Sequence, residues 1–445
     1  MFQNNAFHVI PVSDCPPLTV SVCGSKSITN RALLLAALSD GTCVLENFLF
    51  SEDSRALLDA FCTLGVDISA NEEKREVTVK GCSGVFPNSS TVLNVHKAGT
   101  AARFLTALLA FTEGSFELTC DEQMKKRPML PLFQALRENG FQINETEQAG
   151  FLPAHFTNSK RSSPDPISFE ICVDKSSQFL SALLLTGGLL PGGLTVTVTG
   201  NRRALSYVTM TEQLLTAFSL PFQKYYDEYQ RLTYRILPVN KRPAVRYRIE
   251  PDLSGACYFY AAAPLLGTSV TVKGVHPNSC QGDYRFISVL ESLGCKITDT
   301  PDGICVSGPA SRHYPGADLS MEDFSDQSLT MAVLALFADS PTHIRNISHI
   351  RGQECDRMAA LCNEITRLGG KICEDEDKTG LIITPAPLKG TVIQTYEDHR
   401  MAMAFSLAGL RVPGVIIANP LCCKKTFENY FELFSECFES IRTVV

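Results

Sequence analysis

The chain has 445 residues, of which 44% are hydrophobic and 20% are charged, and its formal net charge is −7 at pH 7. This length exceeds the size at which a single hydrophobic core usually stops growing, so the sequence predicts two domains. The negative net charge argues against a general nucleic-acid-binding protein. The first residues lack the basic flank and the long apolar core of a signal peptide, so we expect a cytoplasmic protein.

The first distinctive stretch covers residues 24–31, Gly-Ser-Lys-Ser-Ile-Thr-Asn-Arg, and runs directly into an apolar segment that predicts a helix. Glycine and hydroxyl side chains are typical of a helix start, where several backbone N–H groups have no partner within the helix. The N-terminus of a helix carries a partial positive charge, and Lys26 and Arg31 add two full charges. We therefore expect this stretch to bind an anion.

The same pattern of a polar cluster, an apolar helix, a turn and a strand recurs six times. The apolar helices are expected to begin near Asn30, Ala101, Ser177, Gly255, Gln327 and Arg400. A second, amphipathic helix usually ends at a glycine suited to the left-handed conformation, as at Gly65, Gly140, Gly294 and Gly369. The last helix is expected from Thr426 to about Ile441. The sequence therefore predicts an α/β fold of six βαβαββ repeats of about 75 residues each.

Two features could suggest a membrane span or a metal site. Residues 176–201 include no charged side chain, but glycines and a proline interrupt the window, which then alternates in polarity. It therefore predicts a buried helix, a turn and a strand. The 17 cysteines are scattered without a Cys-x-x-Cys pair, which is typical of reduced cysteines in a cytosolic core. We expect neither a metal nor a membrane association.

The polar clusters that precede the apolar helices differ in charge. The first three supply cations and hydrogen-bond donors and lie within residues 24–31, 97–103 and 175–178. The fourth and fifth, residues 250–254 and 323–327, supply carboxylates, and the sixth, residues 397–400, supplies both signs. If the repeats bring equivalent ends together, these side chains form a cleft that fits an elongated ligand with several negative groups.

Three further segments place cations at the expected starts of helices, namely residues 125–128, 351–357 and 424–427. Positive charge in the first turn opposes the helix dipole and is unfavourable by about 0.3–1 kcal/mol. Because stability alone does not explain this placement, we expect these cations to face a bound anion.

Together, these clusters resemble the 5-enolpyruvylshikimate-3-phosphate synthases, the enolpyruvyl transferases of the shikimate pathway. The matching motifs follow the family's order along nearly the whole chain: Gly24-Ser25-Lys26-Ser27 with Asn30-Arg31, Ala98-Gly99-Thr100-Ala101-Ala102-Arg103, Lys126-Arg127-Pro128, Ser176-Ser177-Gln178, Glu354-Cys355-Asp356-Arg357, Asp398-His399-Arg400-Met401-Ala402 and Lys425-Thr426-Phe427. The Gly-Ser-Lys-Ser and Asp-His-Arg-Met-Ala motifs are specific to the family.

The resemblance implies a fold of two domains, an inside-out α/β barrel with three repeats in each domain and two crossovers. The first domain would cover residues 22–239, and the second would combine residues 1–21 with residues 240–445. The polar, proline-containing segment Lys241-Arg242-Pro243 fits the second crossover. The active site would lie in the cleft between the domains.

The activity implied by the resemblance is transfer of the enolpyruvyl group of phosphoenolpyruvate to the 5-hydroxyl of shikimate 3-phosphate, without a cofactor. Phosphoenolpyruvate would be bound by Lys26, Lys97, Gly99, Arg127, Gln178, Arg357, Arg400 and Lys425. Shikimate 3-phosphate would be bound by Lys26, Ser27, Arg31, Ser176, Ser177, Gln178, Asp326, His349 and Gln353.

Three residues are assigned to the chemistry by the resemblance. Glu354 is the expected acid and base for the methylene carbon of the enol, and Asp326 is suited to orient or deprotonate the attacking hydroxyl. Lys26 can donate a proton or stabilise developing charge. Considered alone, Glu354 could instead satisfy N–H groups at a helix start and Asp326 could be an ordinary N-cap.

The chain departs from the family's usual pattern at four positions. Lys97 replaces an asparagine, Ala204 replaces a serine, His349 replaces an asparagine, and Gln353 replaces a lysine. Arg202 and Arg203 could compensate for the lost donors. A lost contact to a charged group weakens binding by about 1.5–3 kcal/mol, so we expect an active enzyme with slower turnover or weaker binding.

Two other functions remain open at this point. One is enolpyruvyl transfer to UDP-N-acetylglucosamine, for which a cysteine on a mobile loop would serve, and Cys120 lies near the corresponding region. The other is a degenerate relative that binds ligands without turnover, which the departures at Ala204 and Gln353 motivate. In each case we expect small-molecule ligands, no nucleic acid and a monomer.

Overall fold

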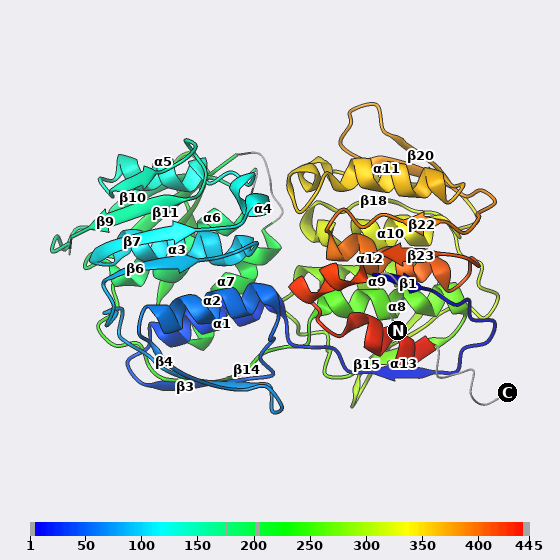
Figure 1. Ribbon diagram of the computed structural model, residues 1–445, viewed down its shortest axis with the longest axis horizontal. Coiled ribbons are helices and arrows are strands. Elements are labelled where there is room, and N and C mark those ends of the chain that lie inside the picture. Colours follow the sequence, from blue (N-terminus) through cyan, green and yellow to red (C-terminus); the bar gives the residue numbers. More distant parts are fainter. Residues whose placement is uncertain (1–4, 160, 175, 201–204, 439–445) are drawn as a thin grey trace. The chain divides into compact units, whose positions relative to one another are not determined.

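The computed structural model of the protein describes residues 5–159, 161–174, 176–200 and 205–438. The chain forms two compact units (Figure 1). The central unit is Gly24–Ile249, and the terminal unit combines Met1–Cys23 with Glu250–Val445. No helix among the described residues is both long enough and apolar enough to cross a membrane.

The described residues of the central unit form three four-stranded sheets and their covering helices. Its strands are β3 Thr42–Glu46, β4 Asp67–Asn71, β5 Glu76–Lys80, β6 Ser90–Asn94, β7 Gly114–Thr119, β8 Ile143–Glu145, β9 Ala154–Asn158, β10 Ile167–Cys172, β11 Leu194–Thr199, β12 Phe222–Tyr226, β13 Leu232–Ile236 and β14 Arg246–Arg248. Its helices are α1 Lys26–Ala37, α2 Glu52–Thr63, α3 Gly99–Phe111, α4 Glu122–Lys125, α5 Leu130–Glu138, α6 Gln178–Thr186, α7 Ser206–Ala217 and the 3-10 helix η1 Gly187–Leu189.

In the part of the terminal unit that the structure describes, the strands form two four-stranded sheets and one three-stranded sheet. Its strands are β1 Ala6–His8, β2 Leu18–Val20, β15 Ser269–Val272, β16 Lys296–Thr300, β17 Gly303–Ser307, β18 Asp318–Ser320, β19 Thr342–Arg345, β20 Lys371–Glu374, β21 Leu381–Thr384, β22 Val392–Ile393 and β23 Ile416–Ala418. Its helices are α8 Leu253–Leu266, α9 Arg285–Ser292, α10 Ser328–Ala335, α11 Arg357–Arg367, α12 His399–Gly409 and α13 Tyr430–Phe438, with the 3-10 helices η2 Gly282–Tyr284, η3 Glu322–Gln327, η4 Ser348–Gly352 and η5 Pro420–Lys425.

One pairing scheme recurs in every four-stranded sheet. When the strands are counted across the sheet from one edge to the other, the first strand pairs parallel with the second, the second pairs antiparallel with the third, and the third pairs antiparallel with the fourth. The strand orders are β14-β3-β5-β4, β6-β7-β9-β8, β10-β11-β13-β12, β2-β15-β17-β16 and β18-β19-β21-β20. The three-stranded sheet, β22-β23-β1, keeps the parallel pair and one antiparallel pair. This mixed α/β architecture agrees with the expected fold class.

Two strands determine where the chain passes between the units. β14 pairs parallel with β3 of the central unit, and β2 pairs parallel with β15 of the terminal unit. The chain therefore leaves the central unit after Ile249, beyond the expected boundary at Val239. Residues 240–249 stay with the central unit because the backbone of β14 hydrogen-bonds there, and because the guanidinium of Arg242 donates to the carbonyl oxygen of Gly188 at 2.6 Å.

The apolar helix that opens each predicted repeat is buried nearly all round, as its sequence indicates. Every residue of α3 from Gly99 to Ala110 is buried, and so are Phe405 and its neighbours throughout α12. The second helices end as expected, because Gly65, Gly140, Gly294 and Gly369 all have positive φ angles. In the third repeat, which lacks this glycine, Ser219 takes the left-handed conformation with a φ of 56°.

Two helix starts differ from the sequence expectation. α1 begins at Lys26, before the expected start near Asn30, so Lys26 and Ser27 lie in its first turn. The last helix, α13, begins at Tyr430 because residues 420–425 form the separate 3-10 helix η5. Lys425 therefore lies in the last turn of η5 and not in the first turn of a helix.

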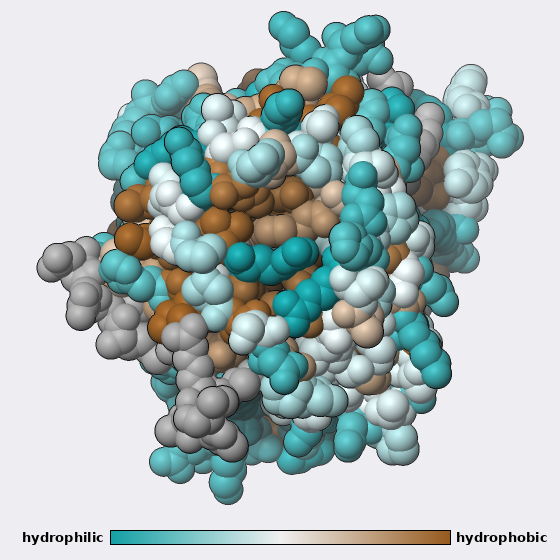
Figure 2. Space-filling model, turned by 90° about the vertical axis from the view of Figure 1, so that its right-hand side faces the viewer, coloured by the Kyte–Doolittle hydropathy of each residue, from teal (hydrophilic) through white to brown (hydrophobic). Residues whose placement is uncertain are grey.

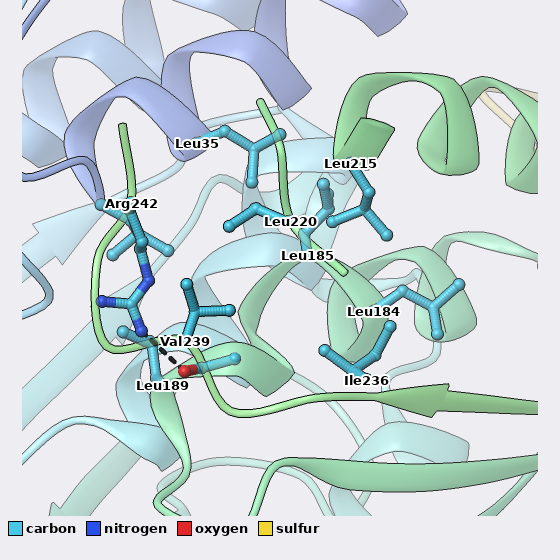
Figure 3. Close-up of a pocket in the computed structure, with 11 residues that line it drawn as sticks. Leu35, Leu184, Leu185, Leu189, Leu215, Leu220, Ile236, Val239 and Arg242 are labelled. Carbon is cyan, nitrogen blue, oxygen red and sulfur yellow. Dashed lines mark hydrogen bonds between the residues drawn. The ribbon is translucent and has the colours of Figure 1, made fainter. Parts of the chain in front are cut away.

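A small apolar cavity lies in the central unit among α1, α6 and α7 (Figure 3). Leucine side chains line it, and Arg242 lies at its edge. Burial lowers the pKa of Arg242, while the charge of Asp40 partly offsets that effect. Since the cavity measures about 10 Å³, it could hold at most one water molecule. It is a packing defect and not a ligand site.

The surface of the terminal unit is mixed in polarity. Figure 2 shows a face on which hydrophobic side chains gather and hydrophilic side chains border them. The large apolar residues of this unit that are exposed, Val392, Tyr396 and Leu421, are each only about two-fifths accessible, at 38%, 39% and 41%. Single exposed apolar residues of this kind are normal on soluble proteins.

Candidate active site

Arg357, the first residue of α11, forms the centre of a charged cluster in the terminal unit. Its side chain is 1% exposed. The guanidinium donates to Asp398 at 2.7 Å, to Glu354 at 2.8 Å and to Asp326 at 3.1 Å. It also donates to the amide oxygen of Gln353 at 2.8 Å. The neighbouring residue Asp356 caps α11, so Arg357 is fixed by the helix start and by four side chains.

Two further cations join this cluster from other elements. Arg400, in the first turn of α12, donates to Asp326 at 2.7 Å and to the hydroxyl of Tyr258 at 3.4 Å. Lys425, at the end of η5, donates to Glu354 at 3.1 Å. The charges therefore alternate in the order Arg400, Asp326, Arg357, Glu354 and Lys425. We call this series, together with Asp398, the charged network.

Because the charged network is buried, its stability depends on the match between its positive and negative charges. Burial by itself lowers the pKa of Arg357, but Asp398, Glu354 and Asp326 together raise it above its ordinary value. Arg357 therefore remains a cation. An anionic ligand would exchange places with the carboxylates that now accept from the cations, since both kinds of partner use the same N–H groups.

His349 and Gln353, two of the positions where the chain departs from the family's pattern, contact this network directly or through a neighbour. His349 shares a hydrogen bond of 2.8 Å with the hydroxyl of Ser325, the residue before Asp326. Gln353 accepts from Arg357. The terminal unit thus brings together seven of the predicted site residues: Asp326, His349, Gln353, Glu354, Arg357, Arg400 and Lys425.

In the central unit, two residues of the first predicted segment differ in burial: Lys26 is half-buried, whereas Arg31 is buried. Lys26 forms an ion pair of 3.2 Å with Asp53 of α2. Arg31 is 2% exposed, and its guanidinium donates to the hydroxyl of Thr211 at 2.8 Å and to the carbonyl oxygen of Ser27 at 2.9 Å. The bond to Thr211 joins α1 to α7. Arg31 therefore has a structural function in addition to any contact with a ligand.

The start of α3 explains the glycine at position 99. A Cβ atom there would lie 2.5 Å from Nη1 of Arg127. Arg103 reinforces the arrangement, because it donates to the carbonyl oxygen of Gly99 at 3.1 Å and to that of Pro128 at 3.2 Å. The family resemblance assigned Gly99 to phosphoenolpyruvate, and in the structure the group that lies against it is the guanidinium of Arg127.

The other predicted residues of the central unit lie at the starts of α3 and α6. Lys97 is exposed just before α3. Gln178 donates to Thr100 of α3 at 3.4 Å, and its backbone N–H donates to Ser176 at 3.2 Å. Ser177 is buried at the start of α6. Lys175, Arg202, Arg203 and Ala204 lie outside the described residues.

The cations outside the apolar helices only partly follow the expected placement. Arg357 does lie in the first turn of α11. Lys125 instead ends α4, and Lys425 ends η5, where the helix dipole favours a cation. The helix dipole therefore gives no argument for an anion at Lys125 or Lys425, and for Lys425 the argument rests on its place in the charged network.

Sequence reasoning assigned no role to several residues that hold the site. Asp53 pairs with Lys26, and Asp398 is fully buried beneath Arg357. Asp398 belongs to a recognised motif, and its position before an apolar helix was a usable signal. Asp53 carried no such signal, because an acidic residue in the first turn of a helix is common.

Cations at helix starts, with carboxylates beside them and an α/β scaffold behind them, define an enzyme for substrates that carry several negative groups. The comparisons with known proteins give the particular kind. A family model described as EPSP synthase (3-phosphoshikimate 1-carboxyvinyltransferase) matches residues 18–434. The chain belongs to this family, whose enzymes carry out enolpyruvyl transfer in the shikimate pathway.

Individual relatives agree with the family match. The chain is 40% identical over 416 residues to the 3-phosphoshikimate 1-carboxyvinyltransferase of Trichormus variabilis, covering 94% of this chain and 95% of that protein. It is 37% identical over 422 residues to the chloroplastic enzyme of Arabidopsis thaliana, covering 92% of this chain and 80% of that protein. The expectation that the chain resembles EPSP synthases is confirmed.

Solved structures share the fold. An EPSP synthase from Acinetobacter baumannii has a TM-score of 0.81 at 24% identity and covers 97% of this chain and 98% of that chain. The enolpyruvyl transferase NikO from Streptomyces tendae has a TM-score of 0.73 at 18% identity, with 96% of each chain covered. At these identities the likeness concerns the fold alone.

Proposed function

We propose that this protein transfers the enolpyruvyl group of phosphoenolpyruvate to the 5-hydroxyl of shikimate 3-phosphate and releases phosphate. The observation that carries this proposal is the charged network, in which Asp326 and Glu354 accept from three buried cations. Phosphoenolpyruvate brings a phosphate and a carboxylate, which match guanidinium and ammonium donors. Family membership gives the class of reaction.

In the proposed reaction, the enol gains a proton at carbon 3 while the 5-hydroxyl attacks carbon 2. Glu354 supplies that proton, and Asp326 accepts the proton of the hydroxyl. The tetrahedral intermediate then expels phosphate, and Glu354 takes a proton back from carbon 3 to restore the double bond. Lys26 stabilises charge or supplies a proton to the leaving phosphate. The proton taken from the 5-hydroxyl leaves with the phosphate, from Asp326 directly or by way of Lys26, so atoms and protons balance without a cofactor.

The binding roles follow the same division. In the proposal, phosphoenolpyruvate contacts Lys26, Lys97, Gly99, Arg127, Gln178, Arg357, Arg400 and Lys425. Shikimate 3-phosphate contacts Lys26, Ser27, Arg31, Ser176, Ser177, Gln178, Asp326, His349 and Gln353. Residues of both units must therefore act on the same pair of substrates.

Two structural points belong to the proposal as well. The recurrent pairing scheme of the sheets supports six βαβαββ repeats, three in each unit. We also place the protein in the cytoplasm as a monomer. Size-exclusion chromatography with light scattering tests the oligomeric state directly.

The decisive experiment measures phosphate release from phosphoenolpyruvate by the purified protein. We expect release that depends on shikimate 3-phosphate. Release that depends on UDP-N-acetylglucosamine would instead assign the protein to the other transferase activity. Binding of both substrates without any release of phosphate would overturn the proposal in favour of a relative that has lost turnover.

A further inference from the structure

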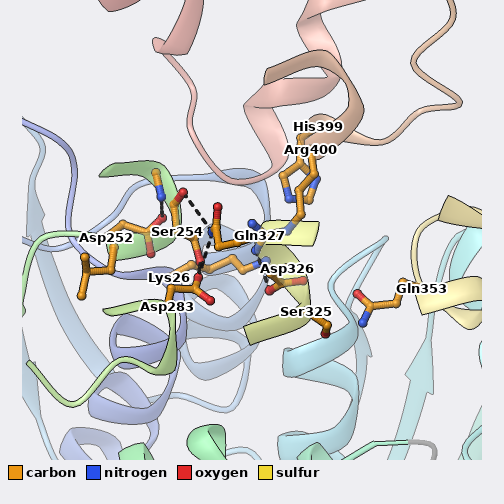
Figure 4. Close-up of polar contacts among 12 residues, drawn as sticks. Lys26, Asp252, Ser254, Asp283, Ser325, Asp326, Gln327, Gln353, His399 and Arg400 are labelled. Carbon is orange, nitrogen blue, oxygen red and sulfur yellow. Dashed lines mark hydrogen bonds and ion pairs between the residues drawn. The ribbon is translucent and has the colours of Figure 1, made fainter. Parts of the chain in front are cut away.

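A buried carboxylate that has no part in the proposed reaction, Asp283, contacts Gln327, the residue that directly follows Asp326. Asp283, in η2, is 6% exposed. It accepts from the hydroxyl of Ser254 in α8 and from the side-chain amide of Gln327 at 3.1 Å. Figure 4 shows these three side chains joined by dashed lines, with Asp326 next to Gln327 and turned toward Arg400.

Several hydrogen bonds fix the side chain of Gln327. It is fully buried, and its amide nitrogen also donates to the carbonyl oxygen of Ser254 at 3.4 Å. Its amide oxygen accepts from the hydroxyl of Thr330 at 3.1 Å. Because Gln327 directly follows Asp326 in the chain, a fixed Gln327 restricts where the carboxylate of Asp326 can lie.

The backbone around Asp326 needs such restraint. η3 is interrupted at Phe324, whose φ of −138° and ψ of 42° are not helical. A regular helix therefore does not hold Asp326 in place. Side-chain contacts hold this segment instead. Arg357 and Arg400 donate to Asp326 itself. On either side of it, Asp283 holds Gln327, and Arg285 of α9 pairs with Asp323 of η3.

The pKa of Asp283 depends on the charges of Asp326 and Arg400. Burial and then the negative charge of Asp326 raise the pKa of Asp283 to about 6. The charge of Arg400 in α12 and the hydrogen bonds from Ser254 and Gln327 act in the opposite direction. Other titratable groups that interact with this region from α8 are Cys257 and Tyr258, whose pKa values burial raises above their ordinary values, and Asp252, the N-cap. Tyr258 accepts from Arg400 at 3.4 Å.

We propose that Asp283 is a positioning residue that fixes the catalytic Asp326 through Gln327, and that loss of its negative charge slows turnover. The inference rests on the proposed function, since it assigns the effect to Asp326. When Asp283 is ionised, its bond to Gln327 is charge-assisted, and protonation replaces it with a weaker neutral bond. Turnover should therefore decrease as the pH falls through about 6.

Two variants separate the charge of Asp283 from its contact with Gln327. Asp283→Asn removes the titrating group and keeps an oxygen that can accept from Ser254 and Gln327. We expect kcat at pH 7.5 to fall about tenfold, with the KM values nearly unchanged, and the decrease in turnover near pH 6 to disappear. A purely structural role of Asp283 would not remove that decrease.

Gln327→Met keeps the titrating carboxylate and removes the contact. We expect a comparable fall in kcat and loss of the acid-side decrease, because titration of Asp283 then no longer reaches Asp326 through Gln327. The control is Asp339→Asn, at an aspartate that is 51% exposed and paired with His313, which should leave kcat and the pH profile unchanged.

The outcomes distinguish this inference from the proposed function. If the unmodified protein releases no phosphate in the presence of shikimate 3-phosphate, the proposed function fails. If it is active and Asp283→Asn keeps both the kcat and the pH profile of the unmodified protein, only the inference fails. Thermal melting of each variant at pH 7.5 shows whether it is folded, and if Asp283→Asn does not fold, a Gln327→Met variant with unchanged kcat overturns the inference.

Discussion

The cations of the two units are held in different ways. In the terminal unit, Arg357, Arg400 and Lys425 share two carboxylates, Asp326 and Glu354, in one connected series. In the central unit, the predicted cations lie on separate elements with separate partners: Lys26 with Asp53, and Arg127 against Gly99. A disturbance should therefore spread through the terminal set and stay local in the central set.

The largest expected effect comes from removing the centre of the charged network. Arg357→Gln leaves Asp398, which is fully buried, without its guanidinium partner. We expect a loss of about 3–5 kcal/mol in the free energy of unfolding and no measurable turnover. Urea unfolding of the variant and of Arg367→Gln, a matched change of a 41% exposed arginine on the same helix, measures the difference. Equal stability of the two variants would contradict the connected arrangement.

The next effect concerns chemistry more than stability. Glu354→Gln keeps an acceptor for Arg357 and Lys425 but removes the group that exchanges a proton with the enol. We expect kcat to fall by about 10²–10⁴-fold. Glu374→Gln, at a glutamate that is 31% exposed and paired with Arg351, provides the control. Near-normal turnover of Glu354→Gln would remove Glu354 from the catalytic role.

A smaller effect is expected from the central unit. Gly99→Ala places a Cβ atom 2.5 Å from Nη1 of Arg127, so this guanidinium must move. We expect the KM for phosphoenolpyruvate to rise about tenfold, as for the loss of one charge-assisted contact, and stability to change little. Gly188→Ala, where the nearest atom would be at 3.4 Å, should behave like the unmodified protein. An unchanged KM for Gly99→Ala would show that Arg127 does not contact the substrate from its present position.

The smallest expected effect is electrostatic and contrasts the units once more. The resolved carboxyl pKa shifts of the central unit, those of Glu46, Glu72, Glu145 and Asp227, are all downward. In the terminal unit, the pKa values of Asp318 and Asp375 are lowered as well, whereas burial raises the pKa of Asp283 to about 6. A raised pKa means that folding favours the protonated carboxyl. Its stabilising contribution is complete below the ordinary pKa of an aspartate and is lost as the pH rises through about 6.

Because the stabilising contribution of Asp283 is lost as the pH rises, its raised pKa can be tested without substrate. The unmodified protein should lose about 1–3 kcal/mol of unfolding free energy between pH 4 and pH 7.5 through Asp283, and Asp283→Asn should lack that part of the pH dependence. Urea unfolding at both pH values, with Asp339→Asn as the control, compares the two. Identical pH dependence in all three proteins would contradict the raised pKa.

The local features of this protein were predictable from its sequence. Apart from the earlier start of α1, the six apolar helices and the glycines that end the second helices appear close to where the pattern placed them, because helix periodicity and the φ preference of glycine act over a few residues. The candidate residues of the terminal unit were also recognisable, because cations and carboxylates at helix starts are unusual in their combination. The family motifs identified the same residues independently.

The tertiary structure decided the features that depend on distant residues. β14 extends the central unit to Ile249 because it pairs with β3, roughly two hundred residues earlier in the chain. Arg31 joins α1 to α7, Gly99 makes room for Arg127, and Asp283 holds Gln327. Each of these partners lies in another element, so no local sequence pattern predicts the contact. The sequence by itself determined which helices form and which side chains carry charge, whereas packing determined which charges meet, because a buried charge is stable only beside a partner that the fold supplies.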